Sequence, residues 1–214
     1  WMNRPWLEDP VDNKMVQGRD AKRFGLNIPR TLVTNSEDSA RRFVESCTEG
    51  AIIKQLSEIG LIDNSSGTPE TYGFYTSIVT EEALKHLNEV SHAPCLFQEA
   101  IPKKADIRAT VVGDKIFAHA IASQSKTASV TDFRREIDLA SETFDFPEET
   151  GNTLLNMLKS WGMEFAACDF ALTKDDRLVF FEANVTGNWL WLEGKDNHPI
   201  LDEIVALLSS KLNT

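Results

Sequence analysis

The spacing of hydrophobic and polar residues along the chain predicts a mixture of short strands and helices. Apolar runs of strand length lie at 51–55, 74–79, 95–101, 107–112, 115–122, 164–173 and 178–184. Apolar residues at helical spacing lie between them, at 12–25, after Ser36, at 81–90 and 147–161, and in a closing helix that begins near Pro199. Strand-length runs bounded by turn residues, with helical segments in between, predict a chain that mixes strands and helices.

Two hairpins are predicted in the second half of the chain. Gly113 and Asp114 join the runs 107–112 and 115–122, and a two-residue connection of this kind is typical of a tight hairpin. The runs 164–173 and 178–184 are joined by residues 174–177.

The second predicted hairpin gathers oxygen-bearing side chains on one face. Glu182 and Asn184 point the same way because side chains alternate along a strand, and Asp169 joins them if it lies opposite Glu182. The same register collects an apolar opposite face for helices to cover, made of Cys168, Phe170, Leu172, Val179, Phe181 and Ala183. Two carboxylates and an amide oxygen suit a hard cation such as Mg²⁺. The alternative interpretation is a solvated polar face on an edge hairpin.

Four basic residues lie where they can neutralise a polyphosphate. Lys14 is near the start of the first predicted helix, Lys54 ends a strand, and Arg134 lies in the polar segment 123–135. Arg108 lies in an otherwise apolar strand and shares its face with Asp106. A phosphate cluster requires such charges around it, although each of them alone is also typical of a surface cation.

A strand that stops at Pro102 offers further candidate ligand contacts. The strand comprises residues 97–101, and backbone groups freed where a strand ends can bind an adenine edge. Glu99 or Asp106 can accept hydrogen bonds from ribose hydroxyls. The alternative is an ordinary edge strand with solvated polar residues.

Three segments break the regular pattern. Residues 56–73 are rich in Gly, Ser, Asn and Pro, which predicts either a lid or a disordered loop. Residues 123–135 are polar and partly basic, and predict a second flexible excursion. Residues 1–11, rich in Trp, Pro and acidic groups, have the composition of a linker. Because the first residue is Trp, we expect the chain to be the C-terminal part of a longer protein.

Composition and charge exclude several classes of protein. The chain has 214 residues, with 33 Asp and Glu against 22 Lys and Arg, a formal net charge of −11. This balance disfavours nucleic-acid binding, which requires clustered positive charge. No apolar run approaches the roughly 20 residues of a membrane span and no signal peptide is evident, so we expect a cytoplasmic protein. The three cysteines, Cys47, Cys95 and Cys168, have neither disulfide nor metal spacing and are expected to be buried reduced thiols.

Taken in chain order, the candidate residues resemble the nucleotide site of an ATP-grasp ligase. The resemblance covers Lys14, Lys54, the Gly- and Ser-rich loop, Gln98–Glu99, Asp106–Arg108, Asp169–Phe170 and Glu182–Asn184. More narrowly, residues 25–35 (GLNIPRTLVTN), 132–134 (DFR) and 187–193 (GNWLWLE) are similar to microviridin-type, or graspetide, ligases. Members of that group form ester or amide macrocycles in a ribosomally made precursor peptide.

The resemblance implies an α+β protein with the ATP-grasp fold, made of two α/β lobes with antiparallel sheets and a nucleotide bound between them. It implies a first lobe at 12–94, a second lobe at 95–214, and a linker at 1–11 from a missing N-terminal domain. The implied cofactors are ATP and Mg²⁺. The implied partners are a precursor peptide and a second copy of the chain in a homodimer.

The resemblance also assigns roles to the candidate residues. Adenine would lie against the strand end at Gln98, Glu99, Ala100 and Ile101, with ribose near Glu99 or Asp106. Phosphates would meet Lys14 and Lys54, and residues 56–73 would close as a lid. Mg²⁺ would be held by Asp169, Glu182 and Asn184. Arg108 and Arg134 would be catalytic, stabilising the transferred phosphoryl group or the acyl intermediate.

The chain departs from the family at two positions. The family usually has Glu-x-Asn-Pro and Gly-Gln-Trp where this chain has Val185 after Asn184 and Asn188 after Gly187. Two other functions stay open. One is an amino-acid ligase similar to RimK or glutathione synthase, and the other is a nucleotide-binding module without ligase activity.

Overall fold

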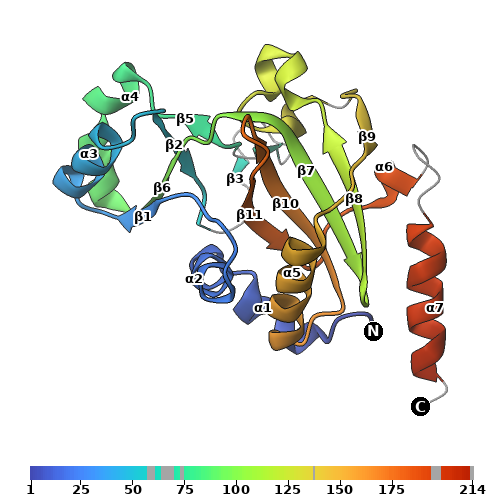
Figure 1. Cartoon of the computed structure of the whole chain (residues 1–214). Coiled ribbons are helices and arrows are strands. Elements are labelled where there is room, and N and C mark those ends of the chain that lie inside the picture. The colour runs from blue at the N-terminus through green and yellow to red at the C-terminus, as the bar shows by residue number, and fades with distance from the viewer. Residues whose placement is uncertain (57–60, 64–69, 73–74, 137, 194–198, 213–214) are drawn as a thin grey trace. The chain divides into compact units, whose positions relative to one another are not determined.

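The chain folds into two compact units (Figure 1). The computed structural model describes residues 1–56, 61–63, 70–72, 75–136, 138–193 and 199–212. Unit 1 contains residues 1–28, 103–125 and 138–214, and unit 2 contains residues 29–102 and 126–137. The chain therefore crosses between the units four times, whereas the division expected from the sequence has a single boundary between residues 94 and 95.

Unit 1 is built on a five-stranded antiparallel sheet in the order β11-β10-β7-β8-β9. Its strands are β7 (Lys103–Val112), β8 (Lys115–Ile121), β9 (Ser141–Thr143), β10 (Phe165–Thr173) and β11 (Leu178–Asn184). Both predicted hairpins are confirmed, β7 with β8 and β10 with β11. Gly113 has a φ of 60°, the left-handed conformation that glycine adopts readily in a tight turn.

The described helices of unit 1 pack against this sheet. They are α1 (Pro5–Val11), α2 (Lys14–Phe24), α5 (Glu148–Ser160), α6 (Leu190–Glu193), α7 (Ile200–Leu212) and the 3₁₀ turn η2 (Ser123–Ser125). Asn13 caps α2 by accepting hydrogen bonds from the backbone N–H groups of Met15 and Val16. Gly25 ends α2 with a φ of 102°.

The predicted linker at residues 1–11 contains α1 and a residue anchored in unit 1. Asn3 is buried, and its side-chain nitrogen donates to the backbone oxygens of Phe165 and Val185. Its side-chain oxygen accepts from the backbone N–H groups of Glu164 and Phe165. These four hydrogen bonds hold the beginning of the chain against the start of β10 and the residue that follows β11.

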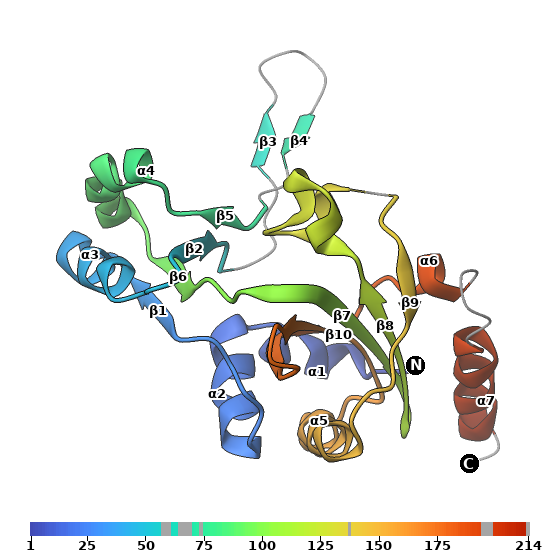
Figure 2. The same ribbon diagram turned by 45° about the horizontal axis from the view of Figure 1, so that its top comes forward.

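The two faces of the sheet in unit 1 differ in polarity. On one face, Ile107, Ala109 and Val111 belong to the main core together with Leu154 and Met157 of α5. The other face has a smaller apolar cluster, formed with α7 and made of Val112, Phe165, Leu192, Ile200 and Ile204. Figure 2 shows α5 and α7 as separate layers around the sheet. Because side chains alternate along β7, the rest of this second face carries its polar residues.

A β-bulge changes the apolar face that was predicted for the second hairpin. Asp169 pairs with Glu182 as expected, but the register then shifts and Phe170 pairs with Phe180. Phe181 is the extra residue, so the β11 side chains that precede it point to the opposite face from the one predicted. Phe180 and Leu178 therefore lie in the main core, so the prediction of Val179 and Phe181 on that face was wrong.

Unit 2 contains a four-stranded antiparallel sheet in the order β1-β6-β2-β5. Its strands are β1 (Thr31–Thr34), β2 (Ala51–Lys54), β5 (Ser77–Ile78) and β6 (Cys95–Glu99). The described helices are α3 (Glu37–Glu45), α4 (Glu81–Lys85) and the 3₁₀ segments η1 (Leu87–His92), η3 (Thr127–Ser129) and η4 (Phe133–Arg135). Ala40 and Val44 of α3 and Phe97 of β6 belong to its core.

The predicted lid at residues 56–73 is described only in part. Strands β3 (Leu61–Asp63) and β4 (Glu70–Tyr72) pair as an antiparallel ladder within it. Residues 57–60, 64–69 and 73 lie outside the described residues, so closure as a lid stays a prediction. The excursion at 123–135 contains three 3₁₀ turns.

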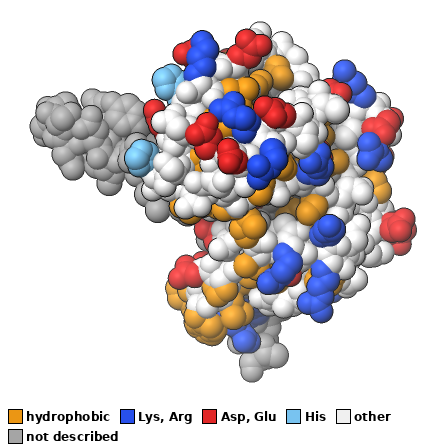
Figure 3. Space-filling view, turned by 90° about the vertical axis from the view of Figure 1, so that its left-hand side faces the viewer, with side chains coloured by type: hydrophobic (Ala, Val, Ile, Leu, Met, Phe, Trp, Pro, Cys, Tyr) orange, Lys and Arg blue, Asp and Glu red, His pale blue; other side chains and the backbone are white. Residues whose placement is uncertain are grey.

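The surface charges, the helix lengths and the cysteines can be compared with what the composition of the chain predicts. Acidic and basic side chains occur side by side over much of the face seen in Figure 3. None of the described helices has the length and apolar content needed to cross a bilayer. All three cysteines are free thiols, and Cys47 and Cys168 are buried, whereas Cys95 is half-buried.

Candidate functional site

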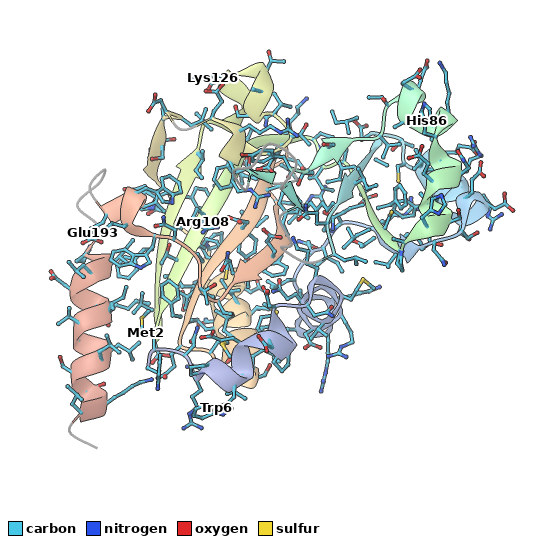
Figure 4. All side chains as sticks on the ribbon, turned by 180° about the vertical axis from the view of Figure 1, so that it is seen from behind. Met2, Trp6, His86, Arg108, Lys126 and Glu193 are labelled. Atoms are coloured by element: carbon cyan, nitrogen blue, oxygen red, sulfur yellow. The ribbon has the colours of Figure 1, made fainter. Side chains whose placement is uncertain are left out.

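A row of polar residues crosses the sheet of unit 1. Asp169 pairs with Glu182 on one side and with Arg108 on the other, and Arg108 pairs with His119, which pairs with Thr143. Residues directly opposite in antiparallel strands share a face, so these five side chains lie on the polar face of the sheet. Arg108 lies on the central strand of this row (Figure 4).

Arg108 and Asp169 form a nearly buried ion pair at the centre of the row. One guanidinium nitrogen, Nη1, lies 2.8 Å from both carboxylate oxygens of Asp169. Only 9% of the Arg108 side chain and 13% of the Asp169 side chain are exposed. The second nitrogen, Nη2, donates to the backbone oxygen of Asn188 at 3.2 Å. Arg108 is therefore held between a carboxylate and the turn that follows β11.

Burial and the charge of the partner shift the pKa values of Asp169 and Arg108 in opposite directions. Burial raises the pKa of Asp169; the Arg108 charge lowers it, and the nearby Glu182 carboxylate raises it further, so that the net direction is upward. For Arg108, burial lowers the pKa, but the Asp169 carboxylate outweighs burial and the guanidinium stays charged. The two contacts at 2.8 Å are those of an ion pair.

The turn after β11 fits against Arg108 because residue 187 is glycine. A Cβ atom on Gly187 would lie 2.5 Å from the Cβ of Ala167 and 3.1 Å from Nη2 of Arg108. The backbone N–H of Gly187 donates to the backbone oxygen of Asn184 at 3.2 Å, which closes the turn. The turn therefore approaches the sheet more closely than a side chain at this position permits.

Lys14 pairs with Glu182 at the edge of the row, with 3.1 Å between Nζ and Oε2. Gln17, one turn further along α2, explains why they meet. Its side-chain oxygen accepts from the backbone N–H of Ala183, and its side-chain nitrogen donates to the Ala183 oxygen at 2.8 Å. Gln17 is 2% exposed, so this double hydrogen bond is a buried link that fixes α2 beside β11.

Asn184 lies on the same face as Glu182, but its side-chain oxygen is engaged by its own turn. It accepts from the backbone N–H of Thr186 at 3.0 Å and from the Thr186 hydroxyl at 3.2 Å. Within the described part of the chain, no three residues among His, Cys, Asp and Glu are grouped to hold a metal. The donor set of two carboxylates and one amide nevertheless fits Mg²⁺, which takes few protein ligands and completes its shell with water and phosphate.

Asp106 is the third carboxylate of the polar face. Lys103 pairs with its Oδ1 atom at 2.7 Å, and both side chains are nearly buried. The other oxygen, Oδ2, is buried, and no hydrogen bond to it is found among the described residues. A buried acceptor of this kind fits a ligand hydroxyl.

The remaining candidate residues belong to unit 2. Gln98 is buried and donates to the Thr31 hydroxyl at 3.0 Å. Glu99 accepts from the backbone N–H of Arg30, and the N–H of Ala100 donates to the Gly50 oxygen. Lys54 ends β2, and Ile101 follows β6. Candidate residues 98–101 thus lie at the end of β6, whereas Lys54 pairs with Leu96, near the beginning of that strand.

Arg134 is held by Asp132 in unit 2. Nε and Nη2 of Arg134 lie 2.9 and 2.7 Å from the two oxygens of Asp132, which also accepts from the backbone N–H of Thr76. Burial raises the pKa of Asp132, but the hydrogen bonds and charge of Arg134, together with the hydrogen bond from the Thr76 backbone, outweigh burial, and the net direction is downward. The carboxylate therefore joins the 3₁₀ segment η4 to the residues before β5.

The lowered pKa of Asp132 predicts a pH-dependent contribution to stability. A carboxylate with a lowered folded-state pKa stabilises the fold above about pH 4 and loses that contribution as the pH falls through the folded-state value. We expect Asp132→Asn to lower the melting temperature at neutral pH, with a deficit that shrinks toward pH 3. Thermal melts between these pH values measure it, with Glu49→Gln as an exposed control. A deficit that stays constant down to pH 3 would contradict the assignment.

Several residues of the site carry no readable signal in the sequence. Gln17 and the backbone oxygen of Asn188 act through contacts with residues distant in the chain, whereas Lys103 pairs with Asp106 only three residues away. In the sequence, Gly187 stands out only as part of the family-like segment 187–193. Its requirement comes from the close approach to Ala167, which only the three-dimensional packing reveals.

Comparisons with known proteins bear on this arrangement. No protein-family model and no curated protein matches the chain. A RiPP-associated ATP-grasp ligase from Chryseobacterium gregarium matches with a TM-score of 0.88 and 28% identity, over 98% of this chain and 63% of that one. The macrocyclase MdnC from Microcystis aeruginosa MRC matches with a TM-score of 0.86 and 31% identity, over 98% of this chain and 65% of that one. The chain has the ATP-grasp fold of the peptide-maturing ligases.

The ATP-grasp fold confirms the predicted α+β class with antiparallel sheets. A second macrocyclase from the same Microcystis strain, MdnB, matches at 30% identity with a TM-score of 0.73, over 95% of this chain and 61% of that one. The chain spans less than two thirds of the length of these relatives. The Chryseobacterium ligase is a complex with ADP and a leader and core peptide, and MdnC is bound to the precursor peptide MdnA.

Proposed function

We propose that this protein is an ATP- and Mg²⁺-dependent carboxylate ligase that forms side-chain ester or amide crosslinks in a ribosomally made precursor peptide. The observation that carries the proposal is the polar row Glu182, Asp169 and Arg108, with Lys14 at its edge, on a chain similar throughout to RiPP ligases. Carboxylates, a lysine and a guanidinium on one face are the groups that a magnesium-bound polyphosphate requires.

The candidate residues fall into three groups, which would bind the metal ion, the phosphates and the nucleoside. Asp169, Glu182 and Asn184 would hold Mg²⁺, which neutralises phosphate charge when bound. Lys14 and Lys54 would bind phosphate oxygens. Gln98, Glu99, Ala100, Ile101 and Asp106 would contact the nucleoside, and the buried Oδ2 atom of Asp106 supports its part in this set. These assignments follow the residue types and the contacts within each unit.

The chemistry joins a carboxylate to an amine or a hydroxyl in two steps. A carboxylate oxygen of the peptide attacks the γ-phosphorus of ATP, the bond to the β,γ-bridging oxygen breaks, and ADP leaves. The amine or hydroxyl group then attacks the carbonyl carbon of the resulting acyl phosphate, loses its proton and expels inorganic phosphate. Arg108 and Arg134 would stabilise the negative charge of the transferred phosphoryl group and of the acyl intermediate. Phosphoryl transfer depends mainly on positioning and charge neutralisation, which these residues supply.

Mass spectrometry tests the ligase activity directly. The protein is incubated with ATP, Mg²⁺ and candidate precursor peptides that are rich in acidic residues and in Ser, Thr or Lys. We expect loss of one water per crosslink, with one ADP and one phosphate released for each. ATP binding without any loss of water from peptides, together with ligation of free amino acids, would instead support a RimK-like ligase.

We further propose a cytoplasmic protein that forms a homodimer. The free thiols are consistent with a reducing compartment. One side of α7 exposes apolar side chains at helical spacing, namely Leu201, Val205, Leu208 and Leu212. Such a stripe supports a partner helix, and light scattering of the purified protein measures whether a second copy supplies it.

A further inference from the structure

We infer, building on the proposed function, that Lys14 is a built-in counter-ion that opposes metal binding at Glu182 until a nucleotide phosphate takes up its ammonium group. Mg²⁺ binding at this site would then depend on the nucleotide. Lys14 would control the order of binding in addition to contacting phosphate.

The first support is that both candidate carboxylates of the metal site already have a cationic partner. Nζ of Lys14 lies 3.1 Å from Glu182, and Nη1 of Arg108 lies 2.8 Å from both oxygens of Asp169. About 20% of each side chain in the Lys14–Glu182 pair is exposed, and still less of the other pair. A metal ion that takes these oxygens must displace or repel two positive groups.

The second support is the charge balance of the row. Lys14 and Arg108 carry two positive charges, and Asp169 and Glu182 carry two negative ones, so the four groups sum to zero. A divalent cation arriving alone would leave two uncompensated positive charges in a partly desolvated site, where charges interact more strongly than in water. When the cation arrives bound to a nucleotide, the phosphates supply negative charge. The Lys14 ammonium group then exchanges the Glu182 carboxylate for a phosphate oxygen.

The third support is that Lys14 cannot easily move away as a whole. It is the first residue of α2, whose start is capped by Asn13. Gln17 fastens the same turn to the backbone of Ala183, next to Glu182. The lysine side chain can swing, but its backbone stays beside the carboxylate, so the competition between ammonium group and metal ion is built into the fold.

Electron paramagnetic resonance of Mn²⁺, a spectroscopic substitute for Mg²⁺, tests this inference on the whole chain. Free Mn²⁺ is titrated with and without ADP for the wild type, Lys14→Met, Lys14→Arg and Lys22→Met. Lys22 is an exposed lysine of the same helix and controls for loss of one positive charge. Thermal melts of each variant verify that it is folded.

We expect the wild type to bind Mn²⁺ weakly alone and more tightly with ADP. Lys14→Met should bind Mn²⁺ alone about tenfold more tightly, because a positive charge near the metal is removed. Its affinity for ADP should fall. Lys14→Arg and Lys22→Met should resemble the wild type in binding Mn²⁺ alone.

The outcomes separate this inference from the proposed function. If ADP promotes Mn²⁺ binding to the wild type but Lys14→Met binds Mn²⁺ alone no better, the counter-ion role is wrong and the nucleotide site stands. Equal tightening in Lys22→Met would also overturn the counter-ion role, because the effect would then reflect net charge only. If ADP has no influence on Mn²⁺ binding to the wild type, the proposed function itself fails.

Discussion

Replacing Asp169 by Asn is expected to abolish ATP turnover and to destabilise the protein. The change removes the negative partner of Arg108, whose side chain is only 9% exposed. Breaking a buried ion pair by removing one partner costs about 3–5 kcal/mol, since the other charge is left buried and unpaired. Turnover should fall by at least about 100-fold, because even partners outside the ligand shell of a metal contribute about 10–100-fold.

A second change separates the two effects. In the double variant Asp169→Asn and Arg108→Met, the unpaired charge is gone, so part of the lost stability should return while turnover stays absent. Asp175→Asn is the control, because that carboxylate pairs with Arg177 at an exposed site in the same hairpin. Denaturant unfolding and ADP release measure the two quantities. Normal turnover in a folded Asp169→Asn protein would rule out a metal-binding role for Asp169.

The second large effect is expected from Gly187→Ala. The added Cβ would lie 2.5 Å from the Cβ of Ala167, an atom that cannot rotate away, so the backbone of the turn or of β10 must shift. Overpacking of this kind typically costs about 1–3 kcal/mol. The shift also moves the Asn188 oxygen that accepts from Arg108, so turnover should fall with stability.

Gly18→Ala is the matched control with the opposite sign. Gly18 lies within α2, and a Cβ atom there meets nothing within 4 Å. Alanine in a helix interior is more favourable than glycine by about 1 kcal/mol, so this variant should melt at a higher temperature. If Gly187→Ala proved as stable and as active as Gly18→Ala, the close approach of the turn to Arg108 would have no functional importance.

The pairing of Asp169 with Glu182 was predictable from the sequence because it depends on local rules. The connection 174–177 and the alternation of side chains limit the possible registers, and the structure confirms the pairing. The bulge at Phe181 was not predictable, since an extra residue in a strand leaves no mark in the hydrophobic pattern. The bulge leaves the predicted pairing of Asp169 with Glu182 unchanged, because the register shifts only beyond Glu182, toward the hairpin turn.

The contacts that hold the charged side chains of the site together could not be predicted from the sequence. Lys14 meets Glu182 only because Gln17 fastens α2 to β11, and Arg108 meets Asp169 only because β7 lies beside β10. These contacts join residues far apart in the chain, where no periodicity constrains the partner. Resemblance to a family selected the candidate residues, but the ion pairs between them are visible only in the folded chain.

Calorimetric titration with ADP tests the central claim most directly. The claim is that the polar row of unit 1 binds a magnesium-bound nucleotide through Glu182 and its neighbours. We predict that ADP binds the wild type in the presence of Mg²⁺ and much more weakly without it, and that Glu182→Gln removes this difference. ADP binding that is equally tight with and without Mg²⁺, or unchanged in Glu182→Gln, would contradict the claim.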